Sequence, residues 1–390
     1  MINWGAGLSH ILFLTPAYPS PLNPVTGIFI REHARAISLY HQVTVVHFTS
    51  TNQGNLTVNL IDDESLHLYR VTYPLPLISY TNLFNRWKAL RSIYTDLKAS
   101  GSPADLIHAN IYTSSDLAYF VSRLDNLPVV LTEHSSAFPR NLVRGVRVMY
   151  YRFFMNRLNA ILPVSQDLKM HLQRYKIQNT YQTISNTVDI NRFHPGLSRI
   201  KNHDSKRILC VAMLFPVKGI HFLLQAFARL SEHLNKCTLW IVGEGPERQS
   251  LEELTRQLAL QDRVIFWGLK DQDEISQMMR EADTFVLTSK WETQSVSAIE
   301  SMASGLAVVA PRTGGLPEII QSFCGELFEP GNIADLVEKL RLVLDNEGKY
   351  PPEQISTYAS REFSHAAIGQ KFSNIYTRVL EEFKQQNGDN

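Results

Sequence analysis

The chain has 390 residues, of which 44% are hydrophobic and 19% charged, and its net charge is +1. This length suits two domains, and the composition is that of a soluble globular protein. It excludes a solenoid of short repeats and a bundle of membrane-spanning helices, because no run approaches about 20 apolar residues. Residues 1–200 carry 18 Lys and Arg against 11 Asp and Glu, whereas residues 201–390 carry 20 against 26. The basic first half fits an anionic partner, and mutual attraction of the two halves explains the asymmetry equally well.

The start of the chain does not have the pattern of a secretory signal, because its apolar run at residues 11–14 is too short. The cysteines are odd in number, scattered and without the spacing of metal ligands. They are typical of reduced core thiols, so we expect a cytoplasmic protein. They are Cys210, Cys237 and Cys324.

In the first half, short apolar runs alternate with helical patterns such as residues 30–40 and 165–175. The runs are continuously apolar, which is typical of a parallel sheet buried on both faces. The predicted strands are residues 10–15, 42–48, 66–71, 106–110, 128–132 and 160–164.

The second half repeats this alternation, which favours parallel strands joined by helical crossovers. The predicted strands are residues 207–213, 237–243, 263–268, 284–288 and 306–311, and the predicted helices lie near 219–233, 246–259, 273–281, 295–304 and 332–345.

A polar segment, residues 186–207, separates the halves and contains the helix breakers Pro195 and Gly196. We therefore predict an α/β protein of two Rossmann-like, doubly wound parallel-sheet domains that face each other across a cleft. The domains are residues 1–195 and 196–364. The segment 364–383 is amphipathic, and we expect a C-terminal helix over 365–386 that packs back on the first domain.

Two glutamates, Glu292 and Glu300, lie eight positions apart in "KWETQSVSAIESMASG". If both were helical, they would be about 12 Å apart along the axis and would not share one small ligand group. The pattern instead predicts a strand that ends at Ser289, a loop that holds Glu292, and a helix that begins near Ser295.

The first-turn amides of that helix, from Ser295, Val296 and Ser297, would form an anion site suited to a phosphate. Glu300 lies further along the helix, where a carboxylate can accept both hydroxyls of a ribose. The stretch therefore predicts a binding site for a nucleoside diphosphate, with Glu292 near whatever the diphosphate carries.

These residues resemble the retaining glycosyltransferases of family 4, also called glycosyl transferases group 1, which have the GT-B fold. The family pattern of two glutamates, "EAMA.G.PVVA" and "GG..E" corresponds here to "ETQSVSAIESMASGLAVVAPRTGGLPEII". Further matches follow in the family's order over roughly residues 10–325, as expected for a complete motif set rather than a chance match. They include "VVLTEHS", "SNTVDINRFHP", "MLFPVKG", "IVGEGPER" and "FWGL".

The resemblance implies that the second domain binds a UDP-, GDP- or ADP-sugar as co-substrate, and that no cofactor or metal is used. The sugar would pass with retention to a hydroxyl of a glycan, a lipid-linked or a small-molecule acceptor, as in the synthesis of cell-surface glycans, glycolipids or polysaccharides. Acceptor choice would rest on loops of the first domain such as residues 74–85. Nucleic acid is not an expected partner.

The resemblance also implies residue roles. Glu300 would bind the ribose, Glu292 the hydroxyls of the donor sugar, and Lys218 the diphosphate. From the first domain, His134 would face the donor sugar, and the backbone at Gly27 would approach a phosphate or sugar closely. Glu292, His134 and Lys218 are thus the candidate catalytic residues, while Gly268 and Leu269 would lie beside the nucleobase. The alternative for each is a structural role, such as an exposed helix lysine or a hydrogen-bonded core histidine.

Three positions depart from the family pattern. Met213 replaces an arginine that pairs with the lysine on the diphosphate, so one charge-assisted contact of about 1.5–3 kcal/mol is missing. Gln294-Ser295 replaces Phe-Gly, and Asn186-Thr187 replaces Asn-Gly. Serine is a good helix N-cap, so the phosphate turn should survive.

Other functions remain open at this point. A nucleotide-sugar epimerase or a phosphorylase could use the same scaffold, and Met213 and Gln294 would also fit a binding subunit that has lost catalysis. Asp271-Gln272-Asp273 resembles a metal-binding pair of acids. Because it directly precedes a helical pattern, it favours a helix N-cap over a metal site.

An arginine-rich, aromatic segment, residues 140–157, favours two interpretations equally. It can lie on an anionic membrane, which would make the protein peripheral at the inner membrane surface, or it can be a core helix whose arginines reach outward.

Overall fold

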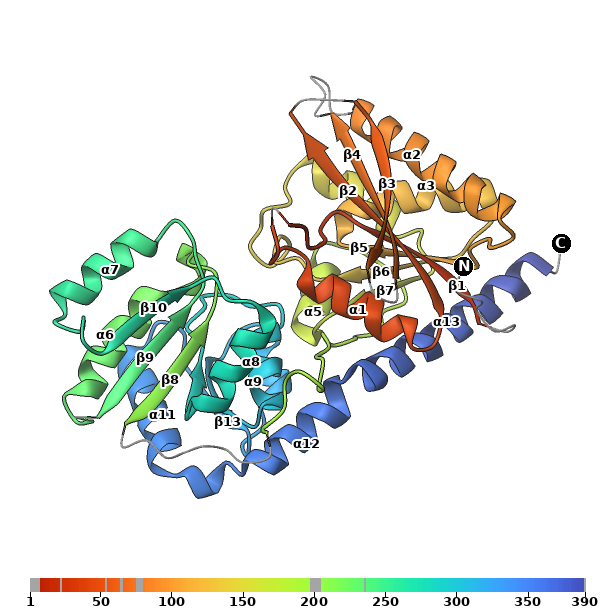
Figure 1. The fold of residues 1–390 in the computed structure, drawn as a ribbon. Helices are drawn as coiled ribbons and strands as arrows, with labels where there is room; N and C mark the ends of the chain where they lie inside the picture. The colour runs from red at the N-terminus through yellow and green to blue at the C-terminus, as the bar shows by residue number, and fades with distance from the viewer. Residues whose placement is uncertain are drawn as a thin grey trace. The chain divides into compact units, whose positions relative to one another are not determined.

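The structure is a computed structural model that describes residues 8–21, 23–52, 55–63, 66–74, 80–196, 205–234 and 236–388. The chain forms two compact units (Figure 1), Met1–Thr187 with His365–Asn390, and Val188–Ser364. The sequence-based boundary at residue 195 lies further along the chain than this division. Residues 197–204 of the predicted linker and residues 75–79 of the predicted acceptor loop lie outside the described residues.

The first unit contains a seven-stranded sheet in the order β3-β4-β2-β1-β5-β6-β7. β3 runs antiparallel to β4, and the other neighbouring strands are parallel. The carboxyl ends of the parallel strands therefore meet at one edge, where the loops that carry function are expected. The strands are β1 (His10–Thr15), β2 (Gln42–Thr51), β3 (Thr57–Asp63), β4 (Leu66–Pro74), β5 (Leu106–Asn110), β6 (Val129–Glu133) and β7 (Ala160–Pro163).

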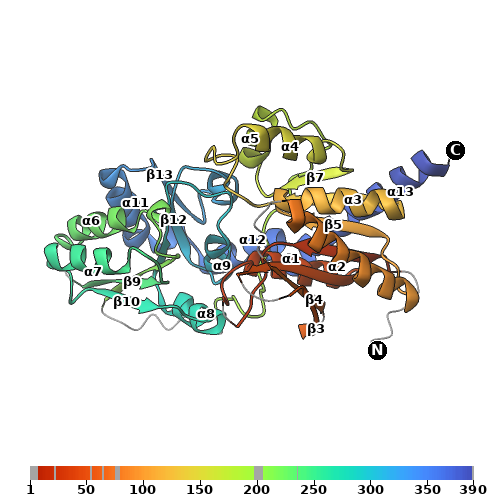
Figure 2. The same cartoon turned by 90° about the horizontal axis from the view of Figure 1, so that it is seen from above.

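Helices cover both faces of this sheet because side chains of each strand alternate between them. Ile11 and Phe13 of β1 join a core with α1 and α13, whereas Leu12 and Leu14 join a second core with α2 and α3. α2 and α3 lie side by side on that second face (Figure 2). The helices are α1 (Ile28–Ser38), α2 (Tyr80–Ala99), η1 (Tyr112–Ser114), α3 (Ser115–Asp125), α4 (Val146–Met155), α5 (Gln166–Arg174) and α13 (His365–Gly388).

The C-terminal helix α13 is part of the core of the first unit. Its Tyr376 side chain is buried, and its hydroxyl lies 2.6 Å from Nδ1 of His108 on β5. Gly369 allows close contact with α1, because a Cβ at this position would lie 2.1 Å from the carbonyl oxygen of Ala36. The chain therefore returns to its first unit at His365.

The second unit contains a six-stranded, wholly parallel sheet in the order β10-β9-β8-β11-β12-β13. A single apolar core surrounds it. The strands are β8 (Lys206–Val211), β9 (Cys237–Val242), β10 (Val264–Gly268), β11 (Thr284–Val286), β12 (Ala307–Pro311) and β13 (Gly325–Phe328). The helices are η2 (Pro216–Lys218), α6 (Ile220–Ser231), α7 (Arg248–Gln257), α8 (Gln272–Glu281), α9 (Val296–Ala303), α10 (Leu316–Ile319), α11 (Ile333–Asp345), η3 (Glu347–Lys349) and α12 (Pro352–Phe363).

Candidate active site

Two loops at the carboxyl edge of the second sheet form the centre of the candidate site. The loop after β8 ends in η2, and its Val217 carbonyl accepts the amide of Lys290 from the loop after β11 at 2.8 Å. Gly219 has a φ of 62°, and a Cβ there would lie 2.5 Å from the carbonyl oxygen of Thr288. Only glycine tolerates both this conformation and this close approach. The loop is thereby held where Lys218 meets the second loop.

Lys218 and Glu292 are brought into direct contact. The Lys218 Nζ atom lies 2.5 Å from Oε1 of Glu292, and the Ser289 hydroxyl donates to the same oxygen at 2.8 Å. The side chain of Glu292 is 11% exposed and that of Lys218 is 26% exposed. A partly buried ion pair of this kind keeps both side chains in fixed positions at the sheet edge.

The Gly-Gly turn after β12 fixes the backbone of Glu292. The amide of Gly315 donates to the carbonyl oxygens of Glu292 and Thr293, at 3.3 and 3.1 Å. A Cβ at Gly314, whose φ is 54°, would lie 1.5 Å from the Glu292 carbonyl oxygen. The "GG..E" pattern in the sequence indicated this turn, and its contact with Glu292 is visible only in the structure.

The predicted helix start is confirmed. Ser295 is the N-cap of α9, and its hydroxyl accepts the amide of Ala298 at 3.3 Å. The strand before it ends at Val286, earlier than the predicted Ser289, and Thr288 already contacts η2, where its hydroxyl donates to the Lys218 carbonyl at 3.1 Å. Val296 and Ser297 occupy the first turn, where amides have no acceptor within the helix.

Glu300 lies inside α9 and is buried, with 8% of its surface exposed. A glutamate on a solvated helix face would be largely exposed, so that alternative does not hold for Glu300. Gln294, which stands at the family's phenylalanine position, is buried as well. Met213 is half-buried, and neither the loop 212–219 nor the loop 287–295 contains an arginine that could replace the missing one.

Gly268 and Leu269 lie at the end of the edge strand β10. Gly268 has a φ of 71°, and its carbonyl accepts the amide of Gly243 from the end of β9 at 2.8 Å. Leu269 is 47% exposed. The Glu244 side chain also reaches this turn, since a Cβ at Gly268 would lie 3.1 Å from its Oε1 atom.

In the first unit, His134 follows β6 and packs on α1. Its ring centre lies 4.7 Å from that of Phe29 and 5.1 Å from that of His33. Burial lowers the pKa of His134 well below its usual value, and the nearby imidazoles lower it further, against the opposing effect of the Asn186 side chain. The imidazole is therefore neutral at pH 7 and able to accept or donate one hydrogen bond at each nitrogen.

Gly27 caps the amino end of α1, the helix on which His134 packs. Its φ is 75°, and a Cβ would lie 2.6 Å from the backbone of Ala17. A glycine is therefore required at position 27, because the backbone of Ala17 lies too close for a side chain. The structure brings Gly27 and His134 to the same helix in the first unit, and the remaining predicted residues belong to the second unit.

One buried acid beside His134 was missed. Glu133, at the end of β6, is fully buried, and its carboxylate accepts the amides of Tyr112 and Ser135, each at 2.6 Å. Burial raises the pKa of Glu133 to about 8, against the lowering effect of these amides. The "TEH" stretch drew attention only through its histidine, although a carboxylate inside an apolar strand was itself a signal.

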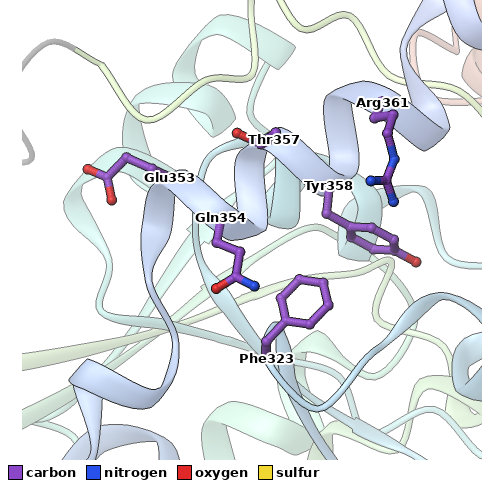
Figure 3. Close-up of a pocket in the computed structure, with 6 residues that line it drawn as sticks. All are labelled: Phe323, Glu353, Gln354, Thr357, Tyr358 and Arg361. Atoms are coloured by element: carbon purple, nitrogen blue, oxygen red, sulfur yellow. The ribbon is translucent and has the colours of Figure 1, made fainter.

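Two other features lie outside the candidate site. Asp271 is confirmed as an N-cap, in a capping box with Glu274 on α8, and Asp273 pairs with Arg192 at 2.8 Å. A surface pocket along α12 has a volume of about 400 Å³, and none of the predicted site residues lines it (Figure 3). There the Tyr358 hydroxyl donates to the carbonyl of Ile319, so the pocket walls serve to pack α12.

Two family models match the chain in the order of its units. Residues 27–192 match "Glycosyltransferase Family 4", and residues 198–362 match "Glycosyl transferases group 1". The chain belongs to glycosyltransferase family 4. The predicted α/β architecture of two parallel-sheet domains, of the GT-B type, is confirmed as well.

Individual glycosyltransferases resemble the chain in sequence and in structure. The N-acetyl-alpha-D-glucosaminyl L-malate synthase of Bacillus anthracis is 28% identical, over 60% of this chain and 63% of its own. The sulfoquinovosyl transferase of Arabidopsis thaliana is 33% identical, over 40% of this chain and 32% of its own. The chain thus spans less than two thirds of either curated relative. The structure of Anabaena Alr3699/HepE with UDP and glucose has a TM-score of 0.75 at 20% identity, covering 95% of this chain and all of that one.

Proposed function

We propose that the protein is a retaining glycosyltransferase that moves a sugar from a nucleoside diphosphate sugar to a hydroxyl acceptor. The contact between Lys218 and Glu292, beside the N-terminus of α9, carries this proposal. This contact places a cation and a carboxylate next to a set of helix amides at one edge of the sheet. Membership of family 4 supports the same assignment.

In this proposal each part of the site handles one portion of the donor. The Glu300 carboxylate accepts the ribose hydroxyls, and the amides of Val296 and Ser297 hold the phosphates with the help of the helix dipole. Lys218 offsets the charge that develops on the leaving diphosphate. Glu292 and, from the first unit, His134 hold the sugar hydroxyls near the reacting carbon. Catalysis then rests on positioning and electrostatics, and no metal is required.

Retention follows from the family's same-face mechanism. The acceptor oxygen bonds to the anomeric carbon on the face that the diphosphate leaves, and a diphosphate oxygen takes the acceptor proton. Atoms and charge balance, because the proton released by the hydroxyl ends on the leaving group. The structure of Anabaena HepE with UDP and glucose supports a uridine donor as the first one to test.

Thermal-shift measurements with a panel of UDP-, GDP- and ADP-sugars test the donor. A donor at about a hundred times its Kd stabilises the folded protein by about 2.7 kcal/mol, so one nucleotide sugar should raise the Tm. Glu300→Ala should abolish that rise, whereas Glu253→Ala, on the exposed face of α7, should preserve it. A chain whose Tm responds to no nucleotide contradicts the proposal.

Product analysis separates the transferase from its alternatives. With donor and acceptor present, the proposed transferase releases the nucleotide, an epimerase leaves the donor intact, and a phosphorylase requires phosphate. If the protein is instead a binding subunit without catalytic activity, Glu292→Ala should leave the activity of its pathway unchanged. Transfer in the presence of EDTA tests the expected independence from metal.

We also propose that a cytoplasmic form of the protein docks on anionic membranes through α4 and its neighbours. Among the residues of α4, only Phe154 and Met155 are buried, while Val146 is 80% exposed, Met149 61% and Phe153 46%. Phe154 packs on α3, with its ring 5.5 Å from that of Phe120. The apolar side of α4 therefore faces outward, which a core helix would not do.

The surroundings of α4 match an anionic lipid surface. The segment 137–158 contains five arginines and no acidic residue. An apolar groove of about 500 Å³ continues the patch along α2 and α3, and within the part of the chain that the structure describes no helix is long and apolar enough to span a bilayer. Aromatic side chains with basic neighbours favour peripheral binding. The groove is lined by Leu83, Phe84, Trp87, Phe120, Arg123 and Leu124.

Vesicle sedimentation tests this docking. The wild type should sediment with vesicles containing anionic phospholipid, less at high salt, and not with purely zwitterionic vesicles. Val146→Glu with Met149→Glu should abolish sedimentation, whereas Leu60→Glu on the exposed strand β3 should not. Equal sedimentation of all three proteins would contradict the proposal.

A further inference from the structure

Glu133 is a fully buried acid to which the proposed chemistry gives no task. Its Oε2 atom accepts the amide of Tyr112, at the start of η1, and its Oε1 atom accepts the amide of Ser135, in the loop after β6. One carboxylate thus joins the two loops that follow neighbouring strands of the first sheet, β5 and β6. Because both oxygens accept amides, either partner loop loses an acceptor if the side chain changes.

The loop after β5 holds an unusual conformation next to this contact. Ile111 has a φ of 63° and a ψ of 137°, which a β-branched residue rarely adopts. Its amide donates to the Thr132 carbonyl, and the following amide, that of Tyr112, donates to Glu133. Such strained residues persist only where their surroundings hold them, and they concentrate at functional sites.

The loop after β6 carries His134. The amide of Ser135, directly after His134, donates to Oε1 of Glu133 at 2.6 Å, so the carboxylate holds the peptide group that follows the imidazole. The Glu133 side chain points to the β5 loop, and the imidazole of His134 packs on Phe29 and His33 of α1. The backbone that carries the imidazole is therefore held by the preceding residue.

We propose that Glu133 is a positioning residue that fixes the direction of His134 toward the donor sugar. This role rests on the proposed function, in which His134 contacts that sugar. Glu133 itself touches no substrate and acts through the loop. A displacement of about 1 Å in a group that positions the substrate is enough to lower the rate about a hundredfold, so a loss of this contact should appear in kcat.

A double-mutant cycle tests the proposal. At pH 9, above the raised pKa of Glu133, the wild-type side chain is a carboxylate with two accepting oxygens, and Glu133→Gln keeps its size but replaces one of them with an NH2 group that cannot accept an N–H. It should lower kcat about tenfold or more and leave the KM for the donor unchanged, since the donor's nucleotide binds the second unit. In a His134→Ala background the same change should alter kcat less than about twofold, because the group that it positions is absent.

A matched control shows what a structural loss alone does. Asp283, in the second unit, is buried and accepts the amide of Arg207 at 2.7 Å, so Asp283→Asn also converts a buried carboxylate to an amide. It should lower the Tm without lowering kcat. If Glu133→Gln does not fold, Glu133→Asp, which retracts the carboxylate by one methylene, takes its place in the cycle.

The outcomes separate the two proposals. A wild type that transfers no sugar from any nucleotide donor overturns the proposed function and this role together. If the wild type is active, two results overturn the role of Glu133 alone. Either Glu133→Gln has the kcat of the wild type, or Glu133→Gln lowers kcat by the same factor in the His134→Ala background as in the wild type.

Discussion

At the scale of single residues, the Lys218 ammonium group neutralises the Glu292 carboxylate in an ion pair. A bound diphosphate would lie near the same ammonium group, so Lys218 would serve a phosphate and a carboxylate at once. Removing it leaves a carboxylate of 11% exposure without its cation. Hydrogen bonds to charged groups contribute about 1.5–3 kcal/mol. We therefore expect Lys218→Ala to lower kcat/KM about 10- to 100-fold, measured with saturating acceptor.

Lys290 offers the matched control for that change. It lies in the adjacent loop, is exposed, and places its Nζ atom 5.9 Å from the ring centre of Phe222 rather than on Glu292. Lys290→Ala should keep kcat/KM within about twofold, because it removes an exposed charge that is screened by solvent. Equal losses in the two variants would show that general positive charge, and not the contact with Glu292, supports the reaction.

At the scale of secondary-structure elements, sequence periodicity predicted the buried strands and the edge strands β7 and β10, but it missed the edge strands β3 and β13. The strands it found, such as β1 and β12, are continuously apolar because helices cover both of their faces. β3, "TVNLIDD", has polar residues, and β13, "GELF", begins with a glycine and a glutamate, so neither has the continuously apolar pattern of a buried strand. The helix start at Ser295 was predictable because capping is local, whereas contacts over long separations were not.

The packing of α13 on α1 gives a prediction at this scale. Helix propensity alone favours alanine over glycine by about 1 kcal/mol. At Gly369, however, a Cβ would lie 2.1 Å from the backbone oxygen of Ala36. Overpacking of this kind costs about 1–3 kcal/mol, so Gly369→Ala should lower the urea midpoint of unfolding.

Gly348 is the matched control for Gly369. Nothing lies within 4 Å of a Cβ built on it, and its φ is not in the left-handed region. Gly348→Ala should leave the urea midpoint unchanged or raise it slightly. If Gly369→Ala raised the midpoint as well, the close crossing of α1 and α13 would not exist in solution.

At the scale of the whole molecule, the candidate site depends on contacts between residues far apart in the chain. The sequence predicted the residues but not the contacts between them. Lys218 and Glu292 are separated by 74 positions, and only the crossing of two loops at the sheet edge makes them partners. The family pattern identified both residues because each stands in a recognisable stretch. Glu133 stands in the matched stretch "VVLTEHS", which pointed only to His134, and its partner Tyr112 lies 21 positions earlier, so its contact required the structure.

The buried histidines of the first unit predict how the whole protein responds to acid. Burial lowers the pKa of His33 and of His47 to about 4, and lowers those of His108 and His134 well below the usual value. In the unfolded chain these rings take up protons near pH 6.5, whereas in the folded unit they stay neutral until a lower pH. The unfolded state therefore binds more protons between about pH 6.5 and 4, and the free energy of unfolding falls as the pH falls through that window. Glu133, whose pKa is raised to about 8, opposes this trend with a single proton.

Calorimetry at pH 7.5 and pH 5 checks this response, with His47→Asn as the informative variant. His47 lies on β2 and is not one of the candidate site residues, and the Arg70 charge adds to the effect of burial on its pKa. Its replacement removes one of the groups that must stay neutral, so the Tm should fall less between the two pH values than it does in the wild type. Between the pKa values of the unfolded and folded states, the free energy of unfolding of the variant should depend less on pH than that of the wild type, by about 1.4 kcal/mol per pH unit, the contribution of one proton. An unchanged acid shift in His47→Asn would mean that His47 titrates alike in the folded and unfolded chains, and that its burial in β2 is not maintained in solution.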